Sequence, residues 1–138
     1  MNQFILASHG GMAAGLKSTL ELIWGELPNV YAIATTRDEK EPITVAARHL
    51  LDNFDPNDQV FILTDVLGGS VNNDMMTLLE DYPHITILCG TNACLAISLA
   101  TYNAPISDEE LDNLLREAQQ QIINCNKRLK AVDEEDDL

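Results

Sequence analysis

Four short apolar runs, each followed by a longer segment with helical periodicity, organise most of the chain. The runs are rich in β-branched residues and apolar throughout rather than alternating, and they are Gln3–Ala7, Val30–Ala34, Val60–Thr64 and Ile85–Cys89. Strands have this pattern when helices cover both faces of a parallel sheet. The pattern therefore predicts an α/β fold with a doubly wound, mainly parallel sheet of four strands flanked by helices.

The segments between these runs carry apolar residues at helical spacing. Two stripes are expected to face the core, namely Met12, Leu16, Leu20 and Ile23 in the first helix and Ile43, Ala47, Leu50 and Phe54 in the second. Trp24 is expected to be buried or half-buried, and a surface aromatic that docks a partner is the alternative interpretation. A third helix is expected to start at Ser70, whose hydroxyl would cap it, and a fourth to cover about residues 92–102. Ser107 and Glu110 form a capping box that opens a fifth helix.

The length and charge of the chain limit its organisation and its partners. A chain of 138 residues is long enough to close one hydrophobic core. We expect one domain over residues 1–132 and an acidic, disordered tail over residues 133–138. Eight Lys and Arg against 22 Asp and Glu give a formal net charge of −14. This balance disfavours nucleic-acid binding and electrostatic attachment to anionic membranes.

The sequence also favours a cytoplasmic protein that does not insert into a membrane. No apolar run reaches the roughly 20 residues that span a bilayer, and no positive charge precedes the N-terminal apolar stretch. The three cysteines, Cys89, Cys94 and Cys125, are interpreted as reduced thiols in the core, since an odd number cannot all pair within one chain. No second Cys or His pair lies at the spacing of a zinc finger, so a zinc site is disfavoured.

Candidate chemistry lies where two of the predicted strands end. Ligands of open parallel sheets bind beyond the carboxyl ends of the strands, where the winding reverses. A strand order of 2-1-3-4 makes the first and third strands neighbours at that reversal, so His9 and Asp65 would meet. An imidazole can act as nucleophile and proton carrier, and a carboxylate can hold its tautomer. The expected phosphate-binding residues, which offer backbone N–H groups and one hydroxyl, are Gly10, Gly68, Gly69 and Ser70. Together these residues predict a histidine that accepts and donates a phosphoryl group.

Other enzyme classes fit the sequence less well. Neither Gly-x-Gly-x-x-Gly after the first strand nor a Walker-type Gly-x-x-x-x-Gly-Lys is present, so no nucleotide cradle is visible. A receiver domain would also place an Asp after the third strand, but it would need an acidic pair where Ser8 and His9 stand. A serine hydrolase could be assembled from Ser70, His9 and Asp65. Against it, Gly-Gly-Ser-Val-Asn is not the Gly-x-Ser-x-Gly elbow, and a serine that caps a helix is already hydrogen-bonded.

Ser8-His9-Gly10 after the first strand and Asp65-Val66-Leu67-Gly68-Gly69-Ser70 after the third form a combined motif. The combination resembles the enzyme IIA component of the mannose-type family in the sugar phosphotransferase system, over about residues 1–132. The resemblance implies that His9 is the phosphorylated histidine, that Asp65 is the carboxylate beside it and that the Ser70 hydroxyl lies near the phosphate. It implies no metal or nucleotide cofactor. The phosphotransfer subunit of dihydroxyacetone kinase shares the fold and the histidine, but it usually lacks the Asp-x-x-Gly-Gly-Ser form.

The family resemblance also implies a relay and an assembly. Phosphorylated HPr, the phosphocarrier protein, would donate to His9, and His9 would pass the group to an enzyme IIB component for uptake of a sugar that the sequence does not identify. Members of the family are homodimers in which a short last strand crosses to the other subunit. Here Lys127–Val132 is the corresponding segment, and a continued helix is equally compatible with its sequence. A regulatory module, whose phosphorylation state is read by another protein, is the alternative function.

Overall fold

A single parallel sheet forms the centre of the computed structural model, which describes residues 1–38 and 40–136. Its strands are β1 (Asn2–His9), β2 (Val30–Thr35), β3 (Gln59–Thr64) and β4 (Thr86–Cys89). They lie in the order β2-β1-β3-β4, and all three pairings are parallel. The α/β fold and the strand order expected from the sequence are confirmed.

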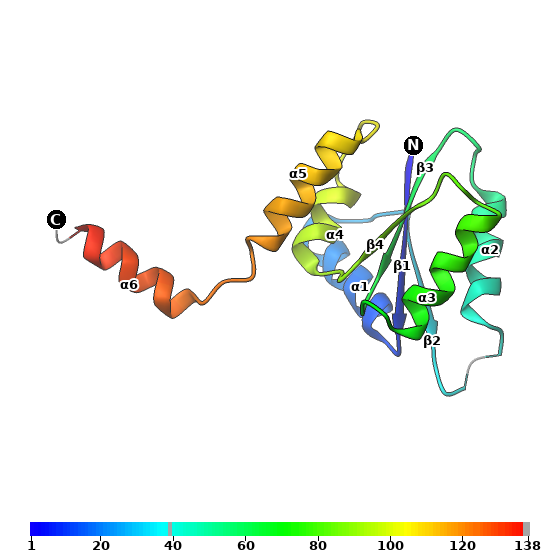
Figure 1. Cartoon of the computed structure of the whole chain (residues 1–138), viewed down its shortest axis with the longest axis horizontal. Helices are drawn as coiled ribbons and strands as arrows, with labels where there is room; N and C mark the ends of the chain where they lie inside the picture. Colours follow the sequence, from blue (N-terminus) through cyan, green and yellow to red (C-terminus); the bar gives the residue numbers. More distant parts are fainter. Residues whose placement is uncertain (39, 137–138) are drawn as a thin grey trace.

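Helices cover both faces of this sheet (Figure 1). They are α1 (Met12–Trp24), α2 (Ile43–Asn53), α3 (Ser70–Thr77) continued by the short 3₁₀ helix η1 (Leu78–Glu80), α4 (Ala93–Ala100), α5 (Asp108–Gln119) and α6 (Cys125–Asp136). On one face lie α2 and α3, and on the other α1, α4 and α5 (Figure 1). Among the described residues, no helix is both long and apolar enough to cross a membrane.

The central strand β1 shows why the apolar runs do not alternate. Phe4 and Leu6 point into the core beneath α1 and α4, whereas Ile5 and Ala7 point into the core beneath α2 and α3. All four side chains are buried, with at most 2% of their surface exposed. Each core alone would require apolar residues at every second position of β1. Two cores together make the run continuous.

The predicted apolar stripe of α1 is partly wrong. Leu20 is fully buried and Ala13 packs beside it, but Met12 and Ile23 are exposed. Trp24 is also exposed, over 62% of its surface, which contradicts the expected burial. The buried face of α1 runs through Ala13 and Leu20, so positions 12 and 23 lie at its edges, and Trp24 lies where the helix ends.

The cysteines do not lie in the core, contrary to the interpretation of the sequence. All three thiols are free, and Cys94 and Cys125 are exposed while Cys89 is half-buried. The buried face of α4 is formed by its neighbours Leu95 and Ala96, which turns Cys94 outward. Cys125 begins α6, which projects from the body of the molecule (Figure 1). Apolar neighbours in sequence therefore did not imply burial here.

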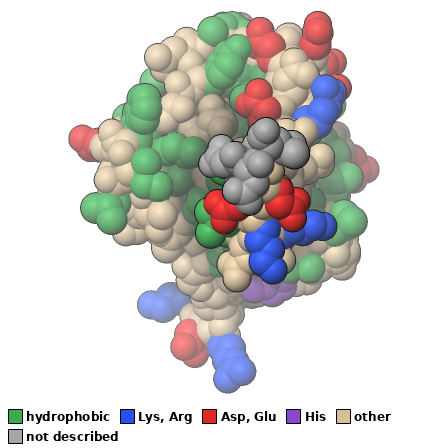
Figure 2. Space-filling model, turned by 90° about the vertical axis from the view of Figure 1, so that its left-hand side faces the viewer, with side chains coloured by type: hydrophobic (Ala, Val, Ile, Leu, Met, Phe, Trp, Pro, Cys, Tyr) green, Lys and Arg blue, Asp and Glu red, His purple; other side chains and the backbone are tan. Residues whose placement is uncertain are grey.

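The C-terminal region is helical as far as it is described. The capping box that opens α5 is confirmed, because the Ser107 hydroxyl accepts the Glu110 N–H and the Glu110 carboxylate accepts the Ser107 N–H, both at 3.2 Å. Lys127–Val132, for which strand and helix were both open, lies in α6. Residues 133–136 of the expected tail belong to α6 as well, and residues 137–138 lie outside the described residues. Acidic and basic side chains are intermixed on the side of the molecule from which α6 projects (Figure 2).

Candidate functional site

The predicted site residues meet at the carboxyl end of the sheet. His9 is the last residue of β1, and Asp65 directly follows β3. These two strands are neighbours, with Ala7 opposite Thr64 in the parallel register. Residues 56 positions apart in the sequence therefore contact each other directly.

Hydrogen bonds hold the His9 ring from both sides. Asp65 Oδ2 lies 2.8 Å from His9 Nδ1 and also accepts the His9 backbone N–H at 2.8 Å. The other carboxylate oxygen accepts the Val66 N–H at 2.9 Å. On the opposite edge of the ring, Nε2 lies 3.0 Å from the Ser70 hydroxyl oxygen. The Asp65 side chain is 6% exposed and the His9 side chain 47%, so a buried carboxylate supports a ring that faces solvent.

The ionisation of Asp65 determines which ring nitrogen is free. Burial alone would raise the pKa of the Asp65 carboxyl, but hydrogen bonds from His9 and Val66 outweigh it and bring the pKa below its ordinary value of 3.8. Near neutral pH the carboxylate is therefore ionised and can only accept hydrogen bonds. Its contact with Nδ1 requires that Nδ1 carry a proton. In the neutral ring, the lone pair is then on Nε2, the nitrogen that faces Ser70.

The turn that carries His9 is fixed by a residue that sequence reasoning did not single out. The buried Ser8 hydroxyl accepts the Ala13 N–H at 2.8 Å and so joins the end of β1 to the first turn of α1. Gly10 adopts a φ of +57°, which favours glycine, and its N–H donates to the Thr35 carbonyl at 2.9 Å. A serine placed just before a strand-to-helix turn is the signal that could have revealed this anchor.

The second glycine turn packs directly against the histidine. Gly68 has a φ of +77°, and the Gly69 N–H donates to the Val66 carbonyl at 3.0 Å. A Cβ atom on Gly69 would lie 3.1 Å from the Val66 carbonyl oxygen and 3.5 Å from His9 Cε1. Gly69 is thus a position of close approach, where any side chain would press on the Val66 carbonyl and touch the His9 ring at an ordinary contact distance.

A buried hydrogen bond anchors the far side of this turn. The Thr64 hydroxyl donates to Asn72 Oδ1 at 2.7 Å, and both residues are buried. It joins the end of β3 to α3, so residues 65–69 are held at both ends. This pair could not be predicted from the sequence, because Asn72 is polar at a position where a helix usually buries apolar residues.

The structure corrects the expected role of Ser70. The N-cap of α3 is Gly69, and Ser70 is the first helical residue, so its hydroxyl does not cap the helix. The hydroxyl is instead hydrogen-bonded to His9. The first three N–H groups of α3 make no hydrogen bond to any residue that the structure describes. Free N–H groups at a helix start and a nearby hydroxyl are suited to bind phosphate oxygens.

Apolar side chains flank the polar centre. Met12, Val66 and Leu67 belong to the two loops of the site or the helix turn beside them, and they are exposed over 47%, 56% and 83% of their surfaces. Exposed apolar residues beside a reactive group are typical of a surface that contacts another protein. Within residues 1–38 and 40–136, no three His, Cys, Asp or Glu side chains are grouped closely enough to bind a metal ion.

Comparisons with known proteins agree on one family. A family model described as the fructose IIA component of the phosphotransferase system matches residues 3–119. The fructose-specific EIIA component of Bacillus subtilis (strain 168) is 22% identical over 134 residues, which cover 96% of this chain and 92% of that protein.

Two solved structures extend the likeness to three dimensions. The mannose/sorbose-specific IIA subunit of Enterococcus faecalis is 26% identical, with a TM-score of 0.76 over 89% of this chain and 93% of that one. The IIA protein associated with the fucose utilization operon of Streptococcus pneumoniae is 25% identical, with a TM-score of 0.79 over 93% of this chain and 96% of that one.

Proposed function

Because the chain belongs to the mannose-type family of enzyme IIA components of the phosphotransferase system, we propose that it is a phosphohistidine carrier. In this proposal the protein works in the cytoplasm. There HPr donates a phosphoryl group to His9, and His9 passes it to a IIB component that serves sugar uptake. The observation that carries the proposal is the position of His9, held at Nδ1 by the buried Asp65 and facing Ser70 with Nε2. Gly10, Gly68, Gly69 and Ser70 are the proposed phosphate-binding residues.

The hydrogen bonds of the His9 ring favour Nε2 as the nitrogen that accepts the phosphoryl group in this proposal. The Nε2 lone pair attacks the phosphorus of the donor's phosphohistidine, and the bond from phosphorus to the donor nitrogen breaks as the new bond forms. The proton on Nδ1 stays in place, and the Asp65 carboxylate stabilises the positive charge that develops on the ring. The Ser70 hydroxyl turns from Nε2 to a phosphate oxygen, next to the free N–H groups of α3.

Transfer between two imidazoles needs little more than alignment. Donor and acceptor nitrogens have similar chemistry, so the group can move on to IIB by the same path in reverse. The exposed Met12, Val66 and Leu67 would exclude water when either partner docks. We include in the proposal that the chain forms a homodimer, as its family resemblance implies, and that no metal or nucleotide takes part.

The decisive experiment is the intact mass of the purified protein after incubation with phosphoenolpyruvate, enzyme I and HPr. We expect one acid-labile phosphoryl adduct that is absent from His9→Ala. The matched control is His49→Ala, which removes another exposed histidine, on α2, and should leave the adduct unchanged. Labelling of His9→Ala at the wild-type rate would show that the site is elsewhere.

One observation favours a second candidate function. Ser70, His9 and Asp65 are hydrogen-bonded in the order of a serine hydrolase triad, and the Ser70 hydroxyl is not used as a cap. A fluorophosphonate probe tests this candidate, because it labels serines activated by a neighbouring base. If the probe labels Ser70 and the protein takes up no phosphoryl group, ester hydrolysis is the better supported function.

Uptake measurements separate the remaining alternatives. Loss of uptake of one sugar in a deletion strain supports the transport role, whereas normal uptake with altered gene expression supports a regulatory module. Transfer from the phosphorylated protein to a dihydroxyacetone kinase subunit, in place of IIB, would assign it to that related branch.

A further inference from the structure

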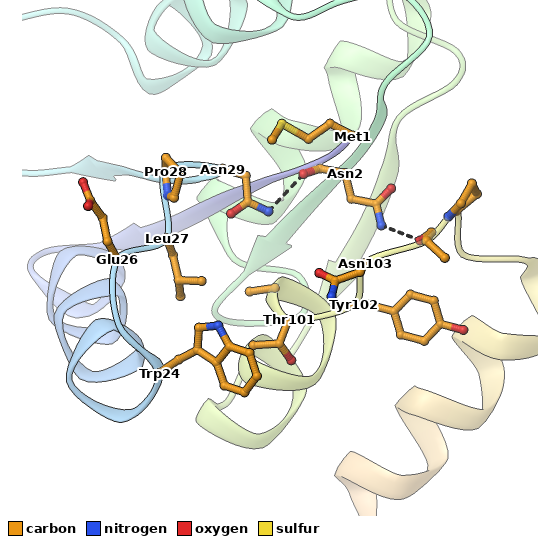
Figure 3. Close-up of a pocket in the computed structure, with 13 residues that line it drawn as sticks. Met1, Asn2, Trp24, Glu26, Leu27, Pro28, Asn29, Thr101, Tyr102 and Asn103 are labelled. Atoms are coloured by element: carbon orange, nitrogen blue, oxygen red, sulfur yellow. Dashed lines mark hydrogen bonds between the residues drawn. The ribbon is translucent and has the colours of Figure 1, made fainter.

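A recess lies at the opposite end of the sheet from His9 (Figure 3). It forms where α1 ends, β1 begins and the chain leaves α4, and its volume is about 430 Å³. Sites for small molecules in proteins are usually recesses of about 300–1,000 Å³ with apolar walls and a few polar groups. The size is therefore sufficient for one small ligand.

The apolar part of the recess includes an exposed aromatic ring. Trp24 lines it together with Leu27, Pro28 and Ala100, and 62% of the Trp24 surface is exposed to solvent. Since Trp is the largest apolar side chain and is usually well buried, this exposure in a concave place leaves a flat apolar surface unused. A ligand with an apolar C–H face can stack on it.

Hydrogen bonds within the wall fix its shape. The Asn2 amide donates to the Ala104 carbonyl at 2.9 Å, and the Asn29 amide donates to the Asn2 carbonyl at 3.1 Å. These bonds join the start of β1 to the loops before β2 and after α4, as Figure 3 shows for Asn29 and Asn2. The wall is thus held in place by bonds between three segments of the chain.

Some of the other polar groups of the recess have no hydrogen-bond partner among the described residues. The Trp24 indole N–H and the Asn103 amide make no hydrogen bond to another described residue, and the Oδ1 atoms of Asn2 and Asn29 are similarly free. An indole N–H can only donate, whereas an asparagine amide both donates and accepts. The recess therefore offers both kinds of hydrogen bond to a ligand.

The charge of the recess excludes anions. No Lys or Arg lines it, the N-terminal ammonium is paired with Asp58 at 3.1 Å, and Glu26 contributes a carboxylate. A phosphorylated or carboxylated compound would find no unpaired positive charge among the described lining residues, and the chain carries a formal charge of −14. Hydroxyl groups, which donate and accept, match the free indole and amide groups without any charge.

We propose that this recess binds an uncharged sugar or sugar alcohol, with its C–H face on Trp24 and its hydroxyls on Asn103 and Asn29. This inference goes beyond the proposed function, since the site is at the far end of β1 from His9 and binding requires no phosphorylation. A ligand of this size with few polar contacts should have a dissociation constant on the order of 1 mM.

Trp24 reports directly on its own recess, because it is the only tryptophan in the chain. We would titrate the unphosphorylated protein with glucose, mannose, fructose and sorbitol and follow the tryptophan fluorescence. A saturable change in intensity or wavelength with at least one of them is expected. In Asn103→Ala the dissociation constant should rise by about tenfold or more. Asn113→Ala, which changes an exposed asparagine on α5, should bind as the wild type does.

Four results would overturn the proposal. The first is no fluorescence change with any of the four compounds up to about 100 mM. The second is an unchanged dissociation constant in Asn103→Ala, and the third is an equal fluorescence change produced by polyethylene glycol, which acts on the solvent alone. A spectrum that depends on protein concentration would also overturn it, since Trp24 would then contact a second copy of the chain. Trp24→Phe, tested by equilibrium dialysis with a radiolabelled sugar and checked for folding by thermal unfolding, should bind more weakly.

Discussion

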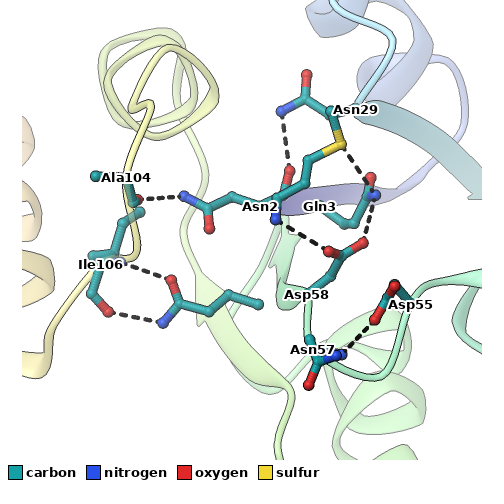
Figure 4. Close-up of polar contacts among 10 residues, drawn as sticks. Asn2, Gln3, Asn29, Asp55, Asn57, Asp58, Ala104 and Ile106 are labelled. Atoms are coloured by element: carbon teal, nitrogen blue, oxygen red, sulfur yellow. Dashed lines mark hydrogen bonds and ion pairs between the residues drawn. The ribbon is translucent and has the colours of Figure 1, made fainter.

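The two ends of the sheet use polar side chains in opposite ways. At the amino end, the side chains of Asn2, Gln3 and Gln59 are buried or half-buried and bond to backbone groups or to Asp58 (Figure 4). At the carboxyl end, exposed His9 and Ser70 bond mainly to each other and to Asp65. Polar groups paired with the backbone stabilise the fold, whereas exposed groups paired with one another keep their capacity to react.

Gln59 shows the structural use most clearly. Its amide donates to the Ile106 carbonyl at 2.9 Å, and its carbonyl accepts the Ile106 N–H at 2.7 Å. Asn2 bonds to Ala104 of the same connector between α4 and α5 (Figure 4). One end of the sheet thereby fixes a loop and the helix that follows it, while the other end leaves its side chains facing solvent.

The largest expected effect is that of Asp65→Asn on phosphoryl transfer. An asparagine amide can donate to Nδ1, which leaves the ring proton on Nε2 and removes the nucleophilic lone pair. The rate of transfer from HPr should fall by about 10²- to 10⁴-fold, as for the loss of a carboxylate that fixes a catalytic histidine. Quenched-flow measurement of the phosphorylated fraction determines this rate.

The matched control for this change is Asp112→Asn, which alters an exposed carboxylate on α5 and should transfer at the wild-type rate. A wild-type rate in Asp65→Asn would mean that the carboxylate only shapes the turn. The carboxyl end of the sheet would then use Asp65 in the same structural way as the amino end uses Gln59.

The next largest effect is on stability and concerns the amino end. Gln59→Met keeps the size of the side chain but removes both bonds to Ile106, leaving a half-buried N–H unpaired. We expect the free energy of unfolding to fall by about 1–3 kcal/mol, with no change in the transfer rate. Urea denaturation measures the loss. Gln120→Met, at an exposed position, should cost nothing measurable, and a reduced transfer rate in Gln59→Met would show that the two ends are not independent.

The sequence predicted the arrangement of the site better than the orientation of single side chains. The four apolar runs and the rule for parallel sheets were enough to expect His9 beside Asp65, because the positions of these two residues depend on strand order alone. The position of the Ser70 hydroxyl depends on whether the N-cap of the helix is residue 69 or residue 70, and a shift of one residue changes a cap into a contact with His9. The exposure of Trp24 depends on where α1 ends relative to α4, which no local pattern records.

A smaller effect is expected from Gly69→Ala at the carboxyl end. The new Cβ would lie 3.1 Å from the Val66 carbonyl oxygen, so the turn beside His9 must shift by a few tenths of an ångström, whereas the distance of 3.5 Å to His9 Cε1 is an ordinary contact. We expect a transfer rate about tenfold lower, because small misplacements of reacting groups reduce rates sharply. In Gly15→Ala the added methyl contacts nothing within 4 Å, and the rate should be unchanged. Equal rates for both variants would show that a shift of the turn at Gly69 does not reach the His9 ring.

The smallest effect distinguishes the two ends by pH. Hydrogen bonds lower the pKa of both carboxyls below the ordinary value of 3.8. At Asp58 the donors are Gln3 and the N-terminal ammonium. At Asp65 burial opposes the shift, and the hydrogen bonds from His9 and Val66 outweigh it. A carboxyl with a depressed pKa in the folded state stabilises the fold above its pKa in the unfolded chain, and this stabilisation is lost as pH falls through the folded value. Asp58→Asn and Asp65→Asn should therefore each flatten the loss of stability below about pH 4.

Denaturant unfolding of the two single variants and of the double variant, measured over the acid range, tests this expectation. Because the two carboxyls lie at opposite ends of the sheet, their effects on stability should be additive in the double variant. A variant whose stability falls with pH as steeply as that of the wild type would show that its carboxyl has the same pKa in the folded and unfolded chains. If the steepness persists only in Asp65→Asn, the hydrogen bonds from His9 and Val66 do not lower the pKa of that carboxyl. A carboxyl with its ordinary pKa is still ionised near neutral pH, so the assignment of the free lone pair to Nε2 would then depend on the contact with Nδ1 alone.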